Sequence, residues 1–253
     1  MTATDRRFAN TLARGLSLLR AFRADDDGVS HSELAARTGL PNATVSRLTY
    51  TLVELGFLVR AGQGFRLGPA TLALGNVAGA SVSFLTLGGR IMQDLANRTG
   101  TLVSMAVRDG DKLVLAETWR PVGAASIWLT PGHRIPVFGS SSGRAILAAL
   151  DTDRFERMAT DALRGWREDG YADLLAHGYT IAPPDTRFAR TINAVAVPFH
   201  ATEFGEPVAF SCGALPADLT DARMGEEVGP ALRDAVRKLE TLTGHAPALV
   251  RRG

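Results

Sequence analysis

The chain has 253 residues, 45% hydrophobic and 21% charged, which is enough for one large domain or two of ordinary size. A single cysteine, Cys212, excludes an intramolecular disulfide and a zinc site built on several cysteines, and it fits a reducing compartment. The formal net charge is +2, and arginines outnumber acidic residues in the first 70 residues, so the positive excess lies in the N-terminal third.

Three helices are predicted in the first 56 residues. Apolar residues recur at helical spacing over 10–24 and stop at an acidic, glycine-containing turn. A second helix of about eight residues lies between Ser30 and Gly39, where Ser30 is placed to cap it. A third helix runs over 42–56. Two short helices joined by a glycine turn predict a helix-turn-helix.

The third predicted helix has two chemically different faces. Its apolar stripe is Val45, Leu48, Leu52 and Leu55. Positions three and four apart share a side of a helix, so the opposite face is short-chained, polar and basic. Such a face suits the major groove, where Asn and Arg hydrogen-bond base edges and a small residue allows close approach. We expect DNA contacts from Asn42, Ala43, Thr44, Ser46, Arg47 and Tyr50. Three-helix units of this kind also occur as protein-interaction modules.

A tight hairpin is predicted directly after this helix. Residues 57–60 and 64–67 have the pattern of two short strands joined by Ala61-Gly62-Gln63. Such a wing would place Arg60, Gln63 and Arg66 beside the phosphates or the minor groove.

The stretch GVSHSELAARTGLPNATVSRLTYTLVELGFLVRAGQGFRLGPATLALG, within residues 10–75, resembles the winged helix of the isocitrate lyase regulator (IclR) family of bacterial transcription factors in order and spacing. A looser resemblance continues in HRIPVFGSSSGRAILAAL, GYTIAPPDTRFARTINAVAVPF and PVAFSCGAL, which are similar to the family's effector domain. The resemblance implies a linker helix that helps to pair two subunits. It also implies a GAF-like sensing domain whose ligands are often small organic acids, including aromatic ones.

The rest of the chain fits these expectations. Residues 76–98 form an imperfect helical stripe with a bend or break expected near Gly88. Strands are expected over 102–107, 112–118, 125–129, 194–199 and 208–213, the first two joined by an Asp-Gly hairpin. Helices are expected over 144–150, 153–163, 171–177 and from about 221 to 242.

The stretch FGSSSGRAIL, residues 138–147, contains the G-x-S-x-G pattern of a serine hydrolase, with Ser141 as the nucleophile. That alternative function lacks its usual context, because a helix-turn-helix, a linker and antiparallel strands precede the serine. A turn of small residues at a helix start instead offers the N–H groups of residues 141–144 to a carboxylate. The alternative is that the serines only cap the helix. We expect no catalytic residue.

The ligand pocket is expected to be apolar, because this chain has aromatic residues where the family often has polar ones. A pocket with an aromatic and sulfur-containing lining favours an aromatic or otherwise bulky carboxylate, although ordinary core packing is an equal alternative for Met105 and Cys212. The expected effector-binding residues are Met105, Trp128, Phe138, Gly139, Ser140, Ser141, Ser142, Gly143, Ala194, Phe210 and Cys212.

These observations predict an α+β protein with an N-terminal winged helix-turn-helix over 1–74, a linker helix over 75–99 and a GAF-like α/β effector-binding domain over 100–253. The expected partners are double-stranded operator DNA, a small organic acid and further copies of the chain, as a homodimer or homotetramer. We expect no cofactor and no metal. Apolar stretches fall short of the roughly 20 residues that cross a bilayer, so we expect a cytoplasmic protein without a membrane partner.

Overall fold

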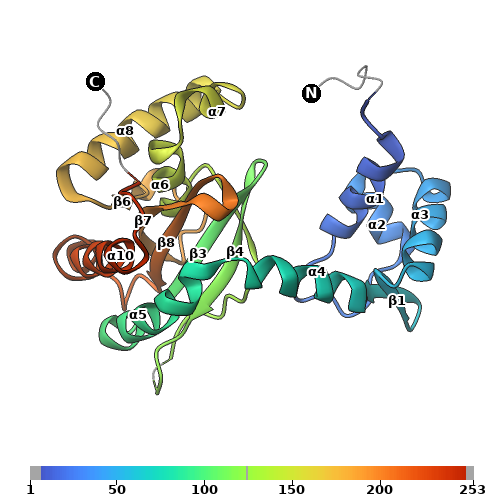
Figure 1. The fold of residues 1–253 in the computed structure, drawn as a ribbon, viewed down its shortest axis with the longest axis horizontal. Helices are drawn as coiled ribbons and strands as arrows, with labels where there is room; N and C mark the ends of the chain where they lie inside the picture. The colour runs from blue at the N-terminus through green and yellow to red at the C-terminus, as the bar shows by residue number, and fades with distance from the viewer. Residues whose placement is uncertain (1–6, 124, 249–253) are drawn as a thin grey trace. The chain divides into compact units, whose positions relative to one another are not determined.

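The computed structural model describes residues 7–123 and 125–248, which divide into two compact units, one ending at Ser81 and the other beginning at Val82 (Figure 1). The first unit consists of α1 (Asn10–Arg20), α2 (His31–Thr38), α3 (Asn42–Glu54), β1 (Leu58–Ala61), β2 (Gly64–Leu67) and α4 (Pro69–Ala80). Ser30 caps α2, because its hydroxyl accepts a hydrogen bond from the N–H of Glu33 at 3.2 Å.

The core of the first unit joins the three helices to the hairpin. Its buried members are Leu18, Phe22, Val29, Leu34, Val45, Leu58 and Phe65. Phe65 of β2 also exchanges two backbone hydrogen bonds of 2.9 Å with Val29 in the loop before α2. A Cβ at Gly64 would lie 2.8 Å from the backbone of Val29, so this close approach of two chains requires glycine.

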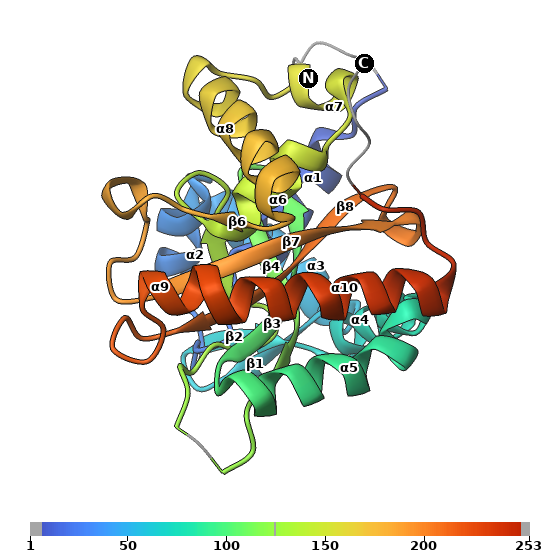
Figure 2. The ribbon, with the colours of Figure 1, turned by 90° about the vertical axis from the view of Figure 1, so that its left-hand side faces the viewer.

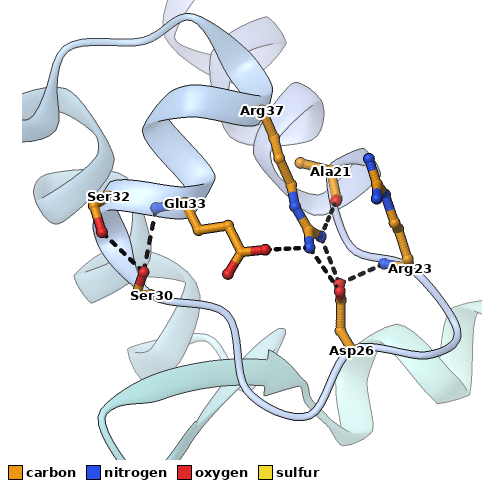
Figure 3. A network of polar contacts seen from close by, with 7 residues as sticks. All are labelled: Ala21, Arg23, Asp26, Ser30, Ser32, Glu33 and Arg37. Atoms are coloured by element: carbon orange, nitrogen blue, oxygen red, sulfur yellow. Dashed lines mark hydrogen bonds and ion pairs between the residues drawn. The ribbon is translucent and has the colours of Figure 1, made fainter.

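An ion-pair network fixes the loop between α1 and α2 (Figure 3). The Arg37 guanidinium donates to both carboxylate oxygens of Asp26 at 2.7 Å, to the carbonyl oxygen of Ala21 at 2.9 Å and to Glu33 at 2.5 Å. The backbone N–H of Arg23 also donates to Asp26 at 2.7 Å. The hydrogen bonds from Arg37 hold the pKa of Asp26 below its ordinary value. The acidic turn is thereby fastened to α2.

The second unit begins with α5 (Ser83–Thr99), β3 (Leu102–Asp109), β4 (Lys112–Trp119), β5 (Arg134–Pro136), α6 (Ser141–Ala149), α7 (Thr152–Glu156), α8 (Asp161–His177) and β6 (Thr180–Ile181). It continues with the short 3₁₀ turn η1 (Pro184–Thr186), β7 (Asn193–Ala201), the 3₁₀ turn η2 (Thr202–Phe204) and β8 (Glu206–Ala214). It ends with α9 (Asp221–Arg223), the π-helical turn η3 (Met224–Val228) and α10 (Gly229–Thr243). The strands form one antiparallel sheet in the order β5-β4-β3-β8-β7-β6.

Helices cover both faces of this sheet. On one face α5 and α10 lie side by side, and their apolar residues pack with Phe199 and Phe210 of the sheet (Figure 2). On the other face lies α6, with α8 packed against it, and Ile146 and Trp166 belong to that second core. The two faces therefore enclose separate clusters of buried side chains.

The predicted fold class is confirmed, but three local expectations are wrong. The helix break expected near Gly88 lies instead at Ser81 and Val82, between α4 and α5. Gly88 serves packing, because a Cβ there would come within 3.0 Å of Leu239 in α10. Residues 125–129 form no strand, and the third strand of the unit is β5. The helices expected over 153–163 and 171–177 are instead the short α7 and one long α8.

Within the ranges that the structure describes, no single helix is long and apolar enough to span a membrane. The helices α4 and α5 reach that length and hydropathy only when they are counted together across their break.

Candidate functional site

The helix α3 buries one flank and exposes the other. Val45 and Thr49 are fully buried, and the Thr49 hydroxyl lies 2.8 Å from Nε2 of His31 in α2. On the opposite flank Ser46, Arg47 and Tyr50 are exposed, Tyr50 to 64%. The helix therefore has one buried side and one exposed polar side, as expected.

The remaining predicted DNA-contact residues of α3 have the following positions. Asn42 and Ala43 are exposed in the first turn of the helix, and Thr44 is half-buried. Leu55, expected in the buried stripe, is 61% exposed, because α3 ends at Glu54 and the chain then turns toward β1. No acidic side chain lies between Asn42 and Tyr50, so the exposed flank offers hydrogen-bond donors and one guanidinium without a competing carboxylate.

The hairpin places its three predicted contact residues at the surface. Arg60 and Gln63 are exposed, and the Arg60 guanidinium lies 5.7 Å from the centre of the Phe65 ring. Arg66 forms an ion pair with Asp27, so part of its charge is already balanced within the first unit. Arg60 is thus the stronger candidate for a phosphate contact in the wing.

A hollow of about 550 Å³, which the sequence gave no reason to expect, lies between α1 and α3. Its lining residues are Thr11 and Arg14 of α1 with Thr44, Ser46, Arg47, Leu48, Tyr50 and Thr51 of α3. Three members of the predicted reading face, Ser46, Arg47 and Tyr50, therefore continue into a polar depression that α1 completes.

The second unit contains a small cavity of about 60 Å³ on the α6 side of the sheet. The predicted residues Gly139, Ser140, Ser141, Ser142 and Ala194 line it. Residues that were not predicted supply the rest, and they are Leu102, Ser104, Leu115, Ile127, Leu129, Ile135, Ala182, Arg187, Phe188, Ala189, Ile192, Ser211 and Gly213. Most of these side chains are apolar, so the cavity has an apolar wall and a polar end.

The polar end is the first turn of α6. The hydroxyl of Ser140 accepts a hydrogen bond from the N–H of Gly143 at 3.0 Å, and the carbonyl of Ser140 accepts one from the N–H of Arg144 at 3.0 Å. Two of the four N–H groups expected to be available are thus already bonded. The N–H groups of Ser141 and Ser142 have no acceptor within the helix. They carry the positive end of the helix dipole at the cavity.

Two further hydroxyls face the cavity from the sheet. Ser104 of β3 and Ser211 of β8 are paired across the strands, with 2.9 Å between their hydroxyl oxygens. Arg187 also borders the cavity, but its guanidinium donates to Ala182, Asn193 and Asp221. Residues two positions apart in a strand face the same side of the sheet, so Leu102 and Gly213 could have indicated Ser104 and Ser211 as further lining residues. Arg187 lies in a loop without a periodic pattern, so the sequence gives no comparable signal for it.

The residues of the G-x-S-x-G stretch pack closely against neighbouring main chain. A Cβ at Gly139, which has a φ of +83°, would lie 2.6 Å from the carbonyl oxygen of Thr186, and a Cβ at Gly143 would overlap the carbonyl oxygen of Val137. The Ser141 hydroxyl donates to the carbonyl oxygen of Ala194 at 2.7 Å and accepts from the N–H of Ala182 at 2.9 Å. Both hydrogen bonds of the Ser141 hydroxyl are thus made with main-chain groups, whereas in a serine hydrolase a histidine would accept the proton of this hydroxyl.

Six residues predicted to bind the effector lie outside the cavity lining. Met105, Phe210 and Cys212 are fully buried in the core under α5 and α10, because alternation points them to the opposite face of the sheet. Burial raises the pKa of the Cys212 thiol to about 12. Gly143 is buried against Val137, as described above.

The other two of these residues, Trp128 and Phe138, are aromatic and exposed. Trp128 is 80% exposed, and its ring stacks on the Arg120 guanidinium at 3.7 Å. Phe138 is 43% exposed, and its ring centre lies 4.9 Å from that of Trp166 in α8. The neighbours Ile127 and Leu129, rather than Trp128, point into the cavity.

The fold and its two candidate sites define a class of protein: a winged helix-turn-helix unit followed by a curled sheet that is covered by helices and borders a small cavity. Residues 11–62 match the IclR helix-turn-helix domain, and residues 80–165 match the C-terminal domain of the bacterial transcriptional regulator IclR.

Relatives agree with these matches. The IclR family transcriptional regulator from Brucella abortus is 31% identical, with a TM-score of 0.76 over 95% of this chain and 94% of that one. An IclR homologue from Microbacterium hydrocarbonoxydans, solved with 4-hydroxybenzoate, has 23% identity and a TM-score of 0.70 over 93% of this chain and 100% of that one. The Pca regulon regulatory protein of Pseudomonas putida is 29% identical over 184 residues, which span 72% of this chain and 60% of that protein. The chain belongs to the IclR family of DNA-binding transcriptional regulators, which are not enzymes.

Ser141→Ala should lower the free energy of unfolding of the second unit by about 1–3 kcal/mol, because it leaves the buried N–H of Ala182 and the carbonyl of Ala194 without their shared partner. Urea unfolding followed by tryptophan fluorescence measures this change, since all three tryptophans lie in the second unit. Ser142→Ala is the matched control, because no hydrogen bond of its hydroxyl is found within the described ranges. Equal stability of the Ser141→Ala and wild-type proteins would contradict the packing role.

Proposed function

We propose that the first unit binds operator DNA by placing the exposed flank of α3 in the major groove. The single observation that carries this proposal is that Ser46 and Arg47 are exposed while Val45 and Thr49 are buried on the same helix. In this proposal Asn42 and Arg47 read base edges, Ala43 allows close approach, and the hydroxyls of Thr44, Ser46 and Tyr50 reach bases or phosphates. Arg60, Gln63 and Arg66 of the wing contact the phosphates or the minor groove.

The proposed active form contains two or four copies of the chain. Large apolar side chains are exposed along α4, where Leu72 and Val77 are 67% and 71% exposed, and on α1 at Leu12 and Leu16. Exposed apolar patches of this kind mark interaction surfaces. A dimer would present two winged helices to a pseudo-palindromic operator, with half-sites spaced by the helical repeat of the duplex. We assign residues 1–74 to DNA binding, 75–99 to the linker and 100–253 to effector binding, in the cytoplasm where the operator is found.

Arg47→Ala should weaken binding to a specific operator by about 1–3 kcal/mol, as expected when a bidentate contact to guanine is lost. The operator would first be selected from random duplexes by the purified protein, and affinity would then be measured by fluorescence anisotropy. Arg157→Ala, directly after α7, removes the same charge from an exposed position outside the linker and should leave affinity unchanged. An unaltered affinity of Arg47→Ala would remove this residue from the reading face.

We further propose that the cavity of the second unit binds a small organic acid with an apolar body, such as an aromatic carboxylate. The N–H groups of Ser141 and Ser142 would receive the carboxylate, and the apolar side chains of the wall would cover the body. The 4-hydroxybenzoate in the Microbacterium homologue supports an aromatic acid. The cavity has a volume of about 60 Å³, less than half of the about 150 Å³ of a cavity that holds benzene. An aromatic ring would therefore need the loop over residues 187–192, which contains Phe188, to move outward.

Effector binding would act by a population shift. The regulator exchanges between arrangements that can and cannot hold both winged helices on the operator, and the acid changes their ratio only if it prefers one of them. An effector that binds only when the loop containing Phe188 is displaced would have such a preference if that displacement is coupled to the arrangement of the winged helices.

Calorimetric titration with benzoate and 4-hydroxybenzoate should give measurable binding, whereas acetate and glyoxylate should bind more weakly because they leave the apolar wall uncovered. Ala194→Leu, which adds three carbon atoms at the cavity wall, should abolish binding of the aromatic acids. Binding confined to the short acids would overturn the proposal of a bulky effector.

A further inference from the structure

The hollow between α1 and α3 has an unusual lining for a depression between two helices. Two guanidinium groups, of Arg14 and Arg47, border it together with five hydroxyls and the single apolar side chain of Leu48. No carboxylate is among its lining residues. Such a surface disfavours cations, and it offers many donors to an anion with several oxygens.

We infer that this hollow seats a phosphate of the duplex backbone beside the reading face, and that Arg14 of α1 is a DNA-contacting residue in addition to those of α3 and the wing. The inference rests on the proposed function, since the hollow shares Ser46, Arg47 and Tyr50 with the proposed base-reading surface. A duplex that brings its bases to Arg47 brings a flanking phosphate to the adjoining depression.

The Arg14 side chain is available for this contact. It is exposed, and no ion pair or hydrogen bond of its guanidinium is found within 7–123 and 125–248. Two other arginines of the first unit differ from it: Arg37 is held by Asp26 and Glu33, and Arg66 is paired with Asp27. A guanidinium that is not neutralised within its own unit contributes its full charge to a polyanion.

The position of Arg14 on α1 separates it from the apolar surface of the same helix. Leu12 and Leu16 lie four residues apart on one exposed side of α1. Thr11 and Arg14, three residues apart, line the hollow and lie on the same side of α1 as the buried Leu18, away from Leu12 and Leu16. A second copy of the chain could therefore cover the leucines without covering Arg14.

A phosphate contact and a base contact have different experimental signatures. A contact to phosphate positions the protein but reads no sequence, so its loss weakens binding to all duplexes by the same factor. It also lowers the slope of log K against log salt by about 0.9 for each phosphate contact, or about 3.5-fold in affinity between 50 and 200 mM salt. Loss of a base contact instead reduces discrimination between sequences.

Arg14→Gln tests the inference with the full-length protein and two duplexes of equal length, one selected by the protein and one of unrelated sequence. We expect equal fractional losses on both duplexes and a smaller salt slope, with the slope restored in Arg14→Lys because lysine keeps the charge. Arg23→Gln is the matched control, since it removes an exposed charge of the same unit outside the hollow and should retain the wild-type slope.

The possible outcomes separate this inference from the function on which it rests. If Arg14→Gln keeps the wild-type salt slope, or lowers it no more than Arg23→Gln does, while Arg47→Ala still weakens operator binding, only the role of Arg14 is overturned. A loss confined to the selected duplex would also overturn it, because Arg14 would then read a base. If the wild-type protein binds neither duplex at low salt, the proposed DNA binding itself is wrong.

Discussion

The first unit depends on the burial of one flank of α3. Val45 and Thr49 pack toward α2 and the hairpin, and the hydrogen bond between Thr49 and His31 satisfies a polar group in that core. With that flank inside, Ser46 and Arg47 can only point outward. The hydrogen bonds between Arg37 and Asp26 contribute to this arrangement indirectly. They fix the loop that joins α1 to α2, and α3 packs against these two helices.

The second unit uses the two faces of one sheet for different purposes. Under α5 and α10 the face is a continuous core with aromatic side chains. Under α6 smaller residues and serines replace the aromatic ones, and a cavity remains between the sheet and the start of the helix. The glycines and Ser141 of the G-x-S-x-G stretch bring the start of α6 into close contact with neighbouring main chain. The same residues that resemble a catalytic motif thus shape one end of the cavity.

The sequence predicts the first unit well because its signals are local. The spacing of Val45 and Leu48, the Ser30 cap and the turn at Gly62 each depend on residues that are near in the chain. The cavity depends on long-range packing, and there the predictions fail in part. Alternation correctly places Phe210 and Cys212 on one side of β8, but only the positions of α5 and α10 determine which face that side belongs to. Likewise, Gly88 predicts a helix break when the sequence is considered alone. The structure gives another reason for the glycine, because a larger side chain there would crowd Leu239 of α10.

The most direct test of the account is the chemical accessibility of α3 with and without DNA. Because Cys212 is fully buried, a single introduced cysteine reports its own position when the protein is treated with a maleimide. The account predicts that Ser46→Cys reacts rapidly and is protected by a selected duplex, whereas Thr49→Cys reacts slowly in either case. Equal reactivity of Ser46→Cys with and without the duplex, or slow reaction in the free protein, would contradict it.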